Sequence, residues 1–177
     1  MRLYHGSDVA VETPRIAFNK GFADLGQGFY LTDDCEAATR RARSRAHKQG
    51  RETGAVSVYD FDEEALPWVC AGSGAPAVAP AAAFGLCFDD GIEGIAAWAR
   101  YIQACRKGET EIAGVGRPSV VRAWIATEEI EMVCAGFISA DELAEVLDTS
   151  ELIVQYCFAD QDLIDRRLAF VQSFEVR

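Results

Sequence analysis

The sequence predicts an α+β domain with largely antiparallel strands. The expected strands and helices follow one another without the strict strand–helix alternation of a parallel α/β fold. At 177 residues the chain has room for one domain with a substantial core, but not comfortably for two. Half of the residues are hydrophobic and a quarter are charged, which is typical of a chain that folds. We therefore expect a single domain over residues 1–177.

The first half is predicted to hold three strands and one helix. Alternating apolar and polar residues and aromatic side chains favour the strands. Asp33 and Asp34 are candidates for the N-cap of the helix. The segment 8–27 has little periodicity and reads as a loop, and the segment 71–85, rich in Ala, Gly and Pro, as a connector. The predicted strands are 2–5, closed by Gly6 and Ser7, 29–32 and 56–61, and the helix runs from 35 to about 47.

The second half is predicted to hold two helices and four strands. Apolar residues from Ile92 to Ala104 are spaced for one helix face, and Gly108 ends that helix. Ser139 and Glu142 form a capping box at the start of a short helix. The expected strands are 120–126 and 130–135, paired around the turn 127–129, followed by 152–158 and 168–176.

Composition and charge limit the classes of partner that we expect for this chain. No apolar run approaches the roughly 20 residues that span a bilayer, and the N-terminus lacks the features of a signal peptide, so we expect a cytoplasmic protein with no membrane contact. The net charge of −11 argues against nonspecific binding of nucleic acid over the whole surface. The segment 40–51 is basic instead. It is either a solvated helix face or a contact surface for a phosphate-bearing ligand or target. Its basic residues are Arg40, Arg41, Arg43, Arg45, His47, Lys48 and Arg51.

The cysteines do not suggest a metal or redox site. None belongs to a Cys-x-x-Cys pair or has a nearby His. We expect no metal and predict mainly buried thiols that pack as small apolar side chains. They are Cys35, Cys70, Cys87, Cys105, Cys134 and Cys157.

Three short motifs carry a resemblance to a known superfamily. The first, His5-Gly6-Ser7, ends the first strand, and the second reads Gly26-Gln27-Gly28-Phe29-Tyr30-Leu31-Thr32-Asp33. Glycines before a strand allow a ligand to approach the backbone closely. In this order, and with the late segment Asp148 to Phe158, the motifs resemble the ADP-ribosyltransferase superfamily of the poly-ADP-ribose polymerase and diphtheria-toxin type.

The resemblance implies a fold and a site. The fold would have two packed, mainly antiparallel sheets with flanking helices and a central cleft for NAD, which is the substrate. Tyr30 and Gln155 would act in catalysis together with His5. The implied contacts are His5 with the adenosine ribose, the Gly6 backbone with the carboxamide, Ser7 with a ribose or phosphate, Gly28 through close approach of the ligand, Tyr30 stacked on the nicotinamide, and Gln155 with the ribose hydroxyl beside the reacting carbon.

The chain departs from the superfamily pattern at three positions. Gln155 stands where the polymerases carry a catalytic glutamate, and an uncharged amide supports a cationic ribose less strongly than a carboxylate does. Glu151 lies about 13 Å away along the same strand. Ile153 replaces the second glutamate of arginine-modifying toxins, and Ala38 stands where the polymerases place a serine. A glutamine in the third motif and a Trp-containing helix at 97–101 are similar to a poorly characterised bacterial family.

The resemblance implies an NAD-dependent mono-ADP-ribosyltransferase that acts on a macromolecule, protein or nucleic acid. Such an enzyme would fit a bacterial toxin component with an antitoxin or immunity partner. Three alternatives stay open: a catalytically weak or inactive NAD-binding or sensing module, an RNA 2′-phosphotransferase, and an unrelated α+β interaction domain that carries the motifs by chance.

Overall fold

A computed structural model describes residues 1–16, 23–72, 83–109 and 116–177. These residues form an α+β structure with five helices and one mixed sheet of eight strands. The helices are α1 (Cys35–Lys48), α2 (Ile92–Arg106), α3 (Glu128–Cys134), α4 (Ala140–Val146) and α5 (Gln161–Arg167). The strands are β1 (Arg2–Ser7), β2 (Phe29–Thr32), β3 (Gly54–Phe61), β4 (Trp68–Ala71), β5 (Gly85–Phe88), β6 (Val120–Trp124), β7 (Val154–Phe158) and β8 (Leu168–Val176).

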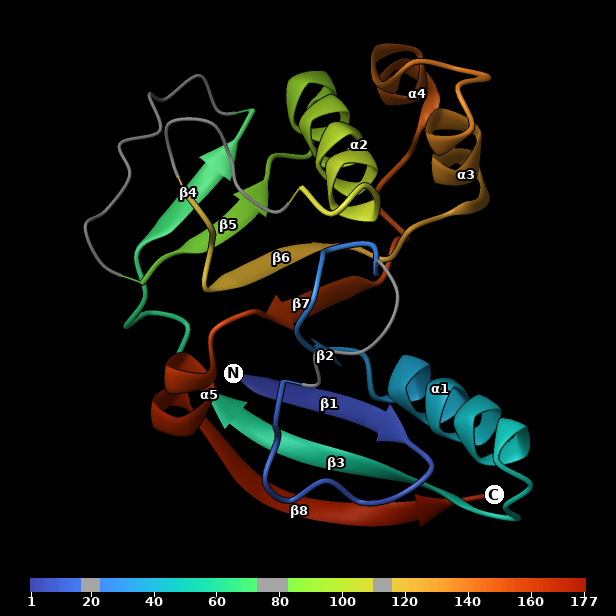
Figure 1. Ribbon diagram of the computed structural model, residues 1–177, viewed down its shortest axis with the longest axis vertical. Coiled ribbons are helices and arrows are strands. Elements are labelled where there is room, and N and C mark those ends of the chain that lie inside the picture. The colour runs from blue at the N-terminus through green and yellow to red at the C-terminus, as the bar shows by residue number, and fades with distance from the viewer. Residues whose placement is uncertain (17–22, 73–82, 110–115) are drawn as a thin grey trace.

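The strands join in one sheet, in the order β4-β5-β6-β7-β2-β1-β3-β8, rather than in the two packed sheets that we expected. Pairing between β2 and β7 connects the two halves of this order. The pairs β4–β5 and β5–β6 are parallel and the other five are antiparallel. Figure 1 shows α2, α3 and α4 beside the β4–β6 end and α1 beside β1 and β3. The sheet is therefore mixed, and its parallel part is confined to one end.

Several predicted elements are confirmed by local contacts. Asp34 caps α1, and its carboxylate accepts hydrogen bonds from the backbone N–H groups of Glu36 and Ala37 at 2.7 and 2.9 Å. The capping box at Ser139 and Glu142 is formed in both directions at the start of α4. Gly108 follows α2 with a φ of 86°, in the left-handed region that suits a glycine after a helix end.

The prediction of a strand over 130–135 is wrong, because these residues belong to α3. Ile130 and Val133 are buried and lie three residues apart, on one face of the helix. Three glutamates in the first turn also favour a helix, since the N-terminal end of a helix attracts negative charge. The apolar residues of 130–135 also suit a strand, so the local signals conflict here.

Three elements were not predicted. β4 and β5 flank the predicted connector, of which residues 73–82 lie outside the described residues. α5 follows β7 directly, and the carboxylate of Asp160 caps it through the backbone N–H groups of Asp162 and Leu163. All three are short, with four, four and seven residues, so they offer little periodicity to read.

The core is divided by the sheet. One cluster packs α2, α3 and α4 against β6 and includes the fully buried Trp98. A second cluster lies on the other face and includes Leu3, Tyr59 and Phe158. A small third cluster joins Ala38 and Ala42 of α1 to the strands beneath. Among the described residues, no helix combines the length and apolar character needed to cross a membrane.

Candidate functional site

The three strands that carry the predicted site residues are neighbours in the sheet. β2 lies between β1, which carries His5, and β7, which carries Gln155. The register pairs Tyr30 with Cys157 and Thr32 with Gln155. Paired residues point to the same face, so Tyr30 and Gln155 share a face and are diagonal neighbours, roughly 7–8 Å apart.

His5 does not converge with them in the expected way. Its ring stacks on Phe29 with centroids 4.4 Å apart, and Phe29 belongs to the core cluster on the opposite face from Tyr30. Side chains alternate along a strand, and the pairing of β1 with β2 gives His5 the orientation of Phe29 and Leu31. The link between the two faces is a hydrogen bond from the His5 ring to the backbone of Tyr30.

β1 and β2 pair over a very short length. Their register joins Tyr4 with Thr32 and records no further pair. If the pairing continued, Gly6 would lie opposite Tyr30. In contrast, β1 pairs with β3 over its whole length, from Arg2 to Ser7. On the side that faces β2, the backbone of Gly6 is therefore not paired with Tyr30. This leaves a position where a ligand amide could form hydrogen bonds with the edge of β1.

His5 lies beside the position where β1 and β2 stop pairing, and a hydrogen bond holds its ring in one tautomer. Its Nδ1 lies 2.8 Å from the carbonyl oxygen of Tyr30. A carbonyl oxygen can only accept, so Nδ1 donates and Nε2 is an acceptor in the neutral ring. Burial lowers the pKa of His5, and the charges of Arg45 and Arg41 lower it further, against an opposing effect of the Tyr30 bond. In neutral His5, Nε2 is therefore a hydrogen-bond acceptor.

Tyr30 has a structural task of its own. Its hydroxyl donates to the carbonyl oxygen of Gly26 at 2.6 Å and accepts from the backbone N–H of Leu25 at 3.1 Å. Burial raises the pKa of Tyr30 far above its usual range, so the phenol stays protonated. The ring is half-buried and packs at the edge of the first core cluster. Tyr30 thus fixes the glycine-containing turn that precedes β2.

Gln155 is oriented by a backbone carbonyl. Its Nε2 donates to the carbonyl oxygen of Trp124 on β6 at 3.2 Å. This bond directs the amide oxygen away from Trp124, where it can accept a hydrogen bond from another group. β7 begins at Val154, so Glu151 lies in the turn before the strand and is exposed. Glu151 is therefore not placed beside Gln155 by the strand, in agreement with the sequence argument.

The three remaining predicted contacts have packing roles. A Cβ atom at Gly6 would lie 1.9 Å from the carbonyl oxygen of Ala38 in α1. A Cβ at Gly28 would lie 2.5 Å from the sulfur of Cys157. Ser7 donates to the carboxylate of Asp8 at 3.3 Å. Close contact with the protein itself therefore accounts for both glycines, and the backbone of Ala38 lies beside Gly6.

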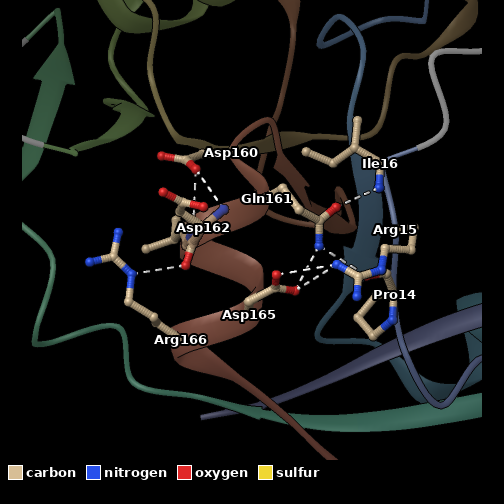
Figure 2. Close-up of polar contacts among 9 residues, drawn as sticks. Pro14, Arg15, Ile16, Asp160, Gln161, Asp162, Asp165 and Arg166 are labelled. Atoms are coloured by element: carbon tan, nitrogen blue, oxygen red, sulfur yellow. Dashed lines mark hydrogen bonds and ion pairs between the residues drawn. The ribbon is translucent and has the colours of Figure 1, made fainter.

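The segment before β2 is anchored by α5. Gln161 accepts a hydrogen bond from the backbone N–H of Ile16 at 2.9 Å and donates to the carbonyl of Pro14 at 3.2 Å. Asp165 bonds the guanidinium of Arg15 and the amide of Gln161. Figure 2 shows these side chains pointing from α5 toward residues 14–16. α5 thereby positions the start of the connection that leads into the glycine motif.

A second polar cluster lies beside Tyr156, which pairs with Arg122, and was missed from the sequence. Arg122 bonds Glu63 at 2.7 Å, and its guanidinium lies 5.2 Å from the ring centre of Trp68. A pocket of about 230 Å³ is lined by Asp33, Phe88, Arg122, Ala123, Trp124, Val154 and Tyr156. Its lining residues come from three strands, β5, β6 and β7, and from the residue after β2, so no local pattern could have indicated it.

The pockets do not coincide with the predicted central cleft. The pocket beside Arg122 includes both sequence neighbours of Gln155, and a second pocket of about 370 Å³ lies between the ends of β1, β3 and β8. Neither is lined by His5, Tyr30 or Gln155. Within the described ranges, no three His, Cys, Asp or Glu side chains are grouped to hold a metal ion. None of the six cysteines, all of which lie within the described ranges, forms a disulfide.

The comparison with known proteins covers part of the chain. Residues 1–70 match the model of a family described as a protein of unknown function (DUF3990). This region is similar to that family and contains His5, Gly6 and Tyr30, but it ends well before Gln155. No curated protein and no solved structure matches the chain.

Proposed function

We propose that this chain is an NAD-dependent mono-ADP-ribosyltransferase that acts on a macromolecular acceptor. The observation that carries the proposal is the separation of β1 from β2 at Gly6 and Tyr30, with β7 and Gln155 next in the sheet. The motifs that resemble the ADP-ribosyltransferases lie far apart in the sequence, and their strands are direct neighbours. An unrelated domain with chance motifs would have no reason to group them.

The hydrogen-bonding capacity of the site suits a dinucleotide. In the proposed complex, the backbone edge at Gly6 bonds the nicotinamide carboxamide, and the ring of the half-buried Tyr30 stacks on the nicotinamide. His5 is given no ligand contact in this complex, because its ring packs on Phe29 on the face opposite to Tyr30. The amide oxygen of Gln155, oriented by Trp124, accepts from the hydroxyl beside the reacting carbon.

The proposed reaction breaks the bond between nicotinamide and ribose. Positive charge grows on the ribose as the bond lengthens, and a catalytic site must stabilise it. The Gln155 oxygen carries only a partial negative charge, so its contribution is smaller than that of a carboxylate. The acceptor nucleophile then bonds to the same carbon, nicotinamide departs with the bonding electron pair, and the acceptor loses a proton.

Gln155 also favours a second candidate, a binding or sensing module that keeps the NAD site without turnover. Strand β7 contributes no carboxylate beside the reacting position, since Ile153 precedes the strand and Glu151 is exposed in the turn. The two candidates predict the same NAD binding and differ in nicotinamide release.

Calorimetry with NAD and an assay of nicotinamide release test both candidates. For the enzyme, Gln155→Ala should lower nicotinamide release by about a hundredfold, the effect of losing one contact made in the transition state. NAD affinity should stay within about threefold, because that contact strengthens only as charge develops. Gln172→Ala, at an exposed position on β8, is the matched control.

Gln155→Glu separates the two candidates. Turnover that is absent in the wild type and gained in Gln155→Glu would establish the sensing module. An active wild type with a slower Gln155→Glu would establish the enzyme with a glutamine suited to its acceptor. Failure of the folded wild-type protein to bind NAD would overturn both candidates.

A further inference from the structure

Helix α1 concentrates positive charge in an acidic protein. It holds five Arg or Lys side chains and one Glu, while the whole chain carries a net charge of −11. Ala38, Ala42 and Ala46 are buried and form the stripe by which the helix packs on the sheet. Since residues three and four apart share a helix face, the basic side chains divide between the two flanks of this stripe and the outer face.

Three basic side chains in and after this helix are bonded to other groups. Arg40 lies 3.9 Å from the carboxylate of Glu36, and Arg51 lies 3.4 Å from that of Asp8. The guanidinium of Arg43 donates to the carbonyl oxygen of Arg177. These contacts agree with the reading of a solvated helix face.

Arg41 and Arg45 differ from these three residues in their lack of a nearby carboxylate among the described residues. In the described part of the chain, neither has a carboxylate within 4 Å, and both side chains are exposed. They are four residues apart on one flank of the buried stripe, so two like charges stand side by side, which disfavours the helix. Partial burial and the charge of Arg45 both lower the pKa of Arg41. The two arginines repel each other and have no carboxylate within 4 Å in the described ranges, so the pair is suited to bind an external anion.

The pair stands next to the proposed NAD site. The backbone of α1 at Ala38 and Ala42 touches Gly6, since a Cβ there would lie 1.9 Å from one and 2.8 Å from the other. Arg41 directly precedes Ala42, and Arg45 is one turn further on. The charges of both arginines also act on the ring of His5. Helix α1 therefore brings Arg41 and Arg45 close to the residues of the proposed site.

We propose that Arg41 and Arg45 bind the diphosphate of the dinucleotide at this site. Cβ atoms at positions i and i+4 of a helix lie about 5–6 Å apart, which lets two guanidinium groups reach two adjacent phosphates. Arginine presents several donors in a plane and forms paired bonds to phosphate oxygens. The proposal rests on the proposed function for the identity of the ligand, but the anion site itself is testable without NAD.

Calorimetry with a panel of ligands tests the proposal. Inorganic pyrophosphate, ADP-ribose and NAD all carry two linked phosphates, and adenosine carries none. The double variant Arg41→Gln/Arg45→Gln should weaken binding of the three phosphate ligands by about a hundredfold, as expected for the loss of charge-assisted hydrogen bonds. The double variant Arg40→Gln/Arg43→Gln removes the same charge from the same helix and should weaken binding by less than about threefold, since exposed charges are screened by salt.

The outcomes separate this inference from the proposed function. NAD binding that is unchanged in Arg41→Gln/Arg45→Gln would overturn the inference and leave the function standing. Pyrophosphate binding that depends on the pair, in a protein that binds no NAD, would support the anion site and overturn the function. Equal losses in the two double variants would overturn the inference, because they would indicate attraction by the whole helix. Tight binding of a single-stranded oligonucleotide that depends on all four arginines would do so too.

Discussion

The close contact between Gly6 and α1 predicts that Gly6→Ala destabilises the protein. The new Cβ would lie 1.9 Å from the carbonyl oxygen of Ala38, which is about 1.1 Å short of the 3.0 Å that real Cβ atoms keep. It would also lie 2.8 Å from the backbone nitrogen of Ala42. Both neighbours belong to the helix backbone, so the helix must shift as a unit.

The expected cost follows from these distances. Overpacking of this kind costs about 1–3 kcal/mol, and the entropy that alanine removes from the unfolded chain returns about 0.4–1 kcal/mol. Because both contacts are with helix backbone, the upper end of the overpacking range applies, and we expect a net loss of about 2 kcal/mol in the free energy of unfolding. For a domain of this length, that loss lowers Tm by about 4–8 °C.

Thermal and urea unfolding of the wild type, Gly6→Ala and Ser7→Ala measure this effect. Ser7 is the adjacent residue, and its hydroxyl makes only a local bond to Asp8, so Ser7→Ala should change stability little. A Gly6→Ala protein within about 0.5 kcal/mol of the wild type would show that α1 does not pack on β1 in this way. The result also matters for the proposed function, because a loss of NAD binding in Gly6 variants would not by itself report a carboxamide contact.

Three further predictions concern other parts of the molecule. The lowered pKa of His5 means that the folded protein binds a proton less readily than the unfolded chain. The stability contributed by neutral His5 is therefore present above about pH 6.5 and lost as pH falls toward the folded pKa. Urea unfolding at pH 7.5 and 5.5 should show a smaller pH effect in His5→Asn than in the wild type, whereas His47→Asn, at an exposed position, should keep the full effect. Gln161→Ala should speed amide hydrogen exchange at Ile16, which loses its acceptor, and an unchanged exchange rate would contradict the anchoring role of α5. Burial raises the pKa of Cys157 to about 12, so a thiol reagent should label it only after unfolding, and labelling of the native protein at Cys157 by mass spectrometry would contradict its placement.

Local chemistry in the sequence was enough to predict the elements that depend on neighbours along the chain. Asp34 caps α1 because its carboxylate reaches N–H groups two and three residues away, and Ser139 and Glu142 satisfy each other across one turn. β2, with Phe29 and Leu31 buried on one face, follows from alternation alone. For α3 the local signals conflicted, and burial of Ile130 and Val133 on one side decided for the helix.

Only the tertiary structure decided which strands are neighbours and which face each side chain takes. Strand pairing joins residues more than a hundred positions apart, such as Thr32 and Gln155, and no local pattern encodes that register. The same register places Tyr30 with Gln155 and turns His5 to the other face, although the motifs alone suggested convergence. Arg122, Glu63 and Trp68 likewise meet only because β6 lies close to the segment before β4. The sequence by itself thus determined the local elements and the motifs that suggest NAD. The geometry of the candidate site depends on long-range packing that a single sequence does not display. This includes the lack of a carboxylate within 4 Å of Arg41 and Arg45 among the described residues.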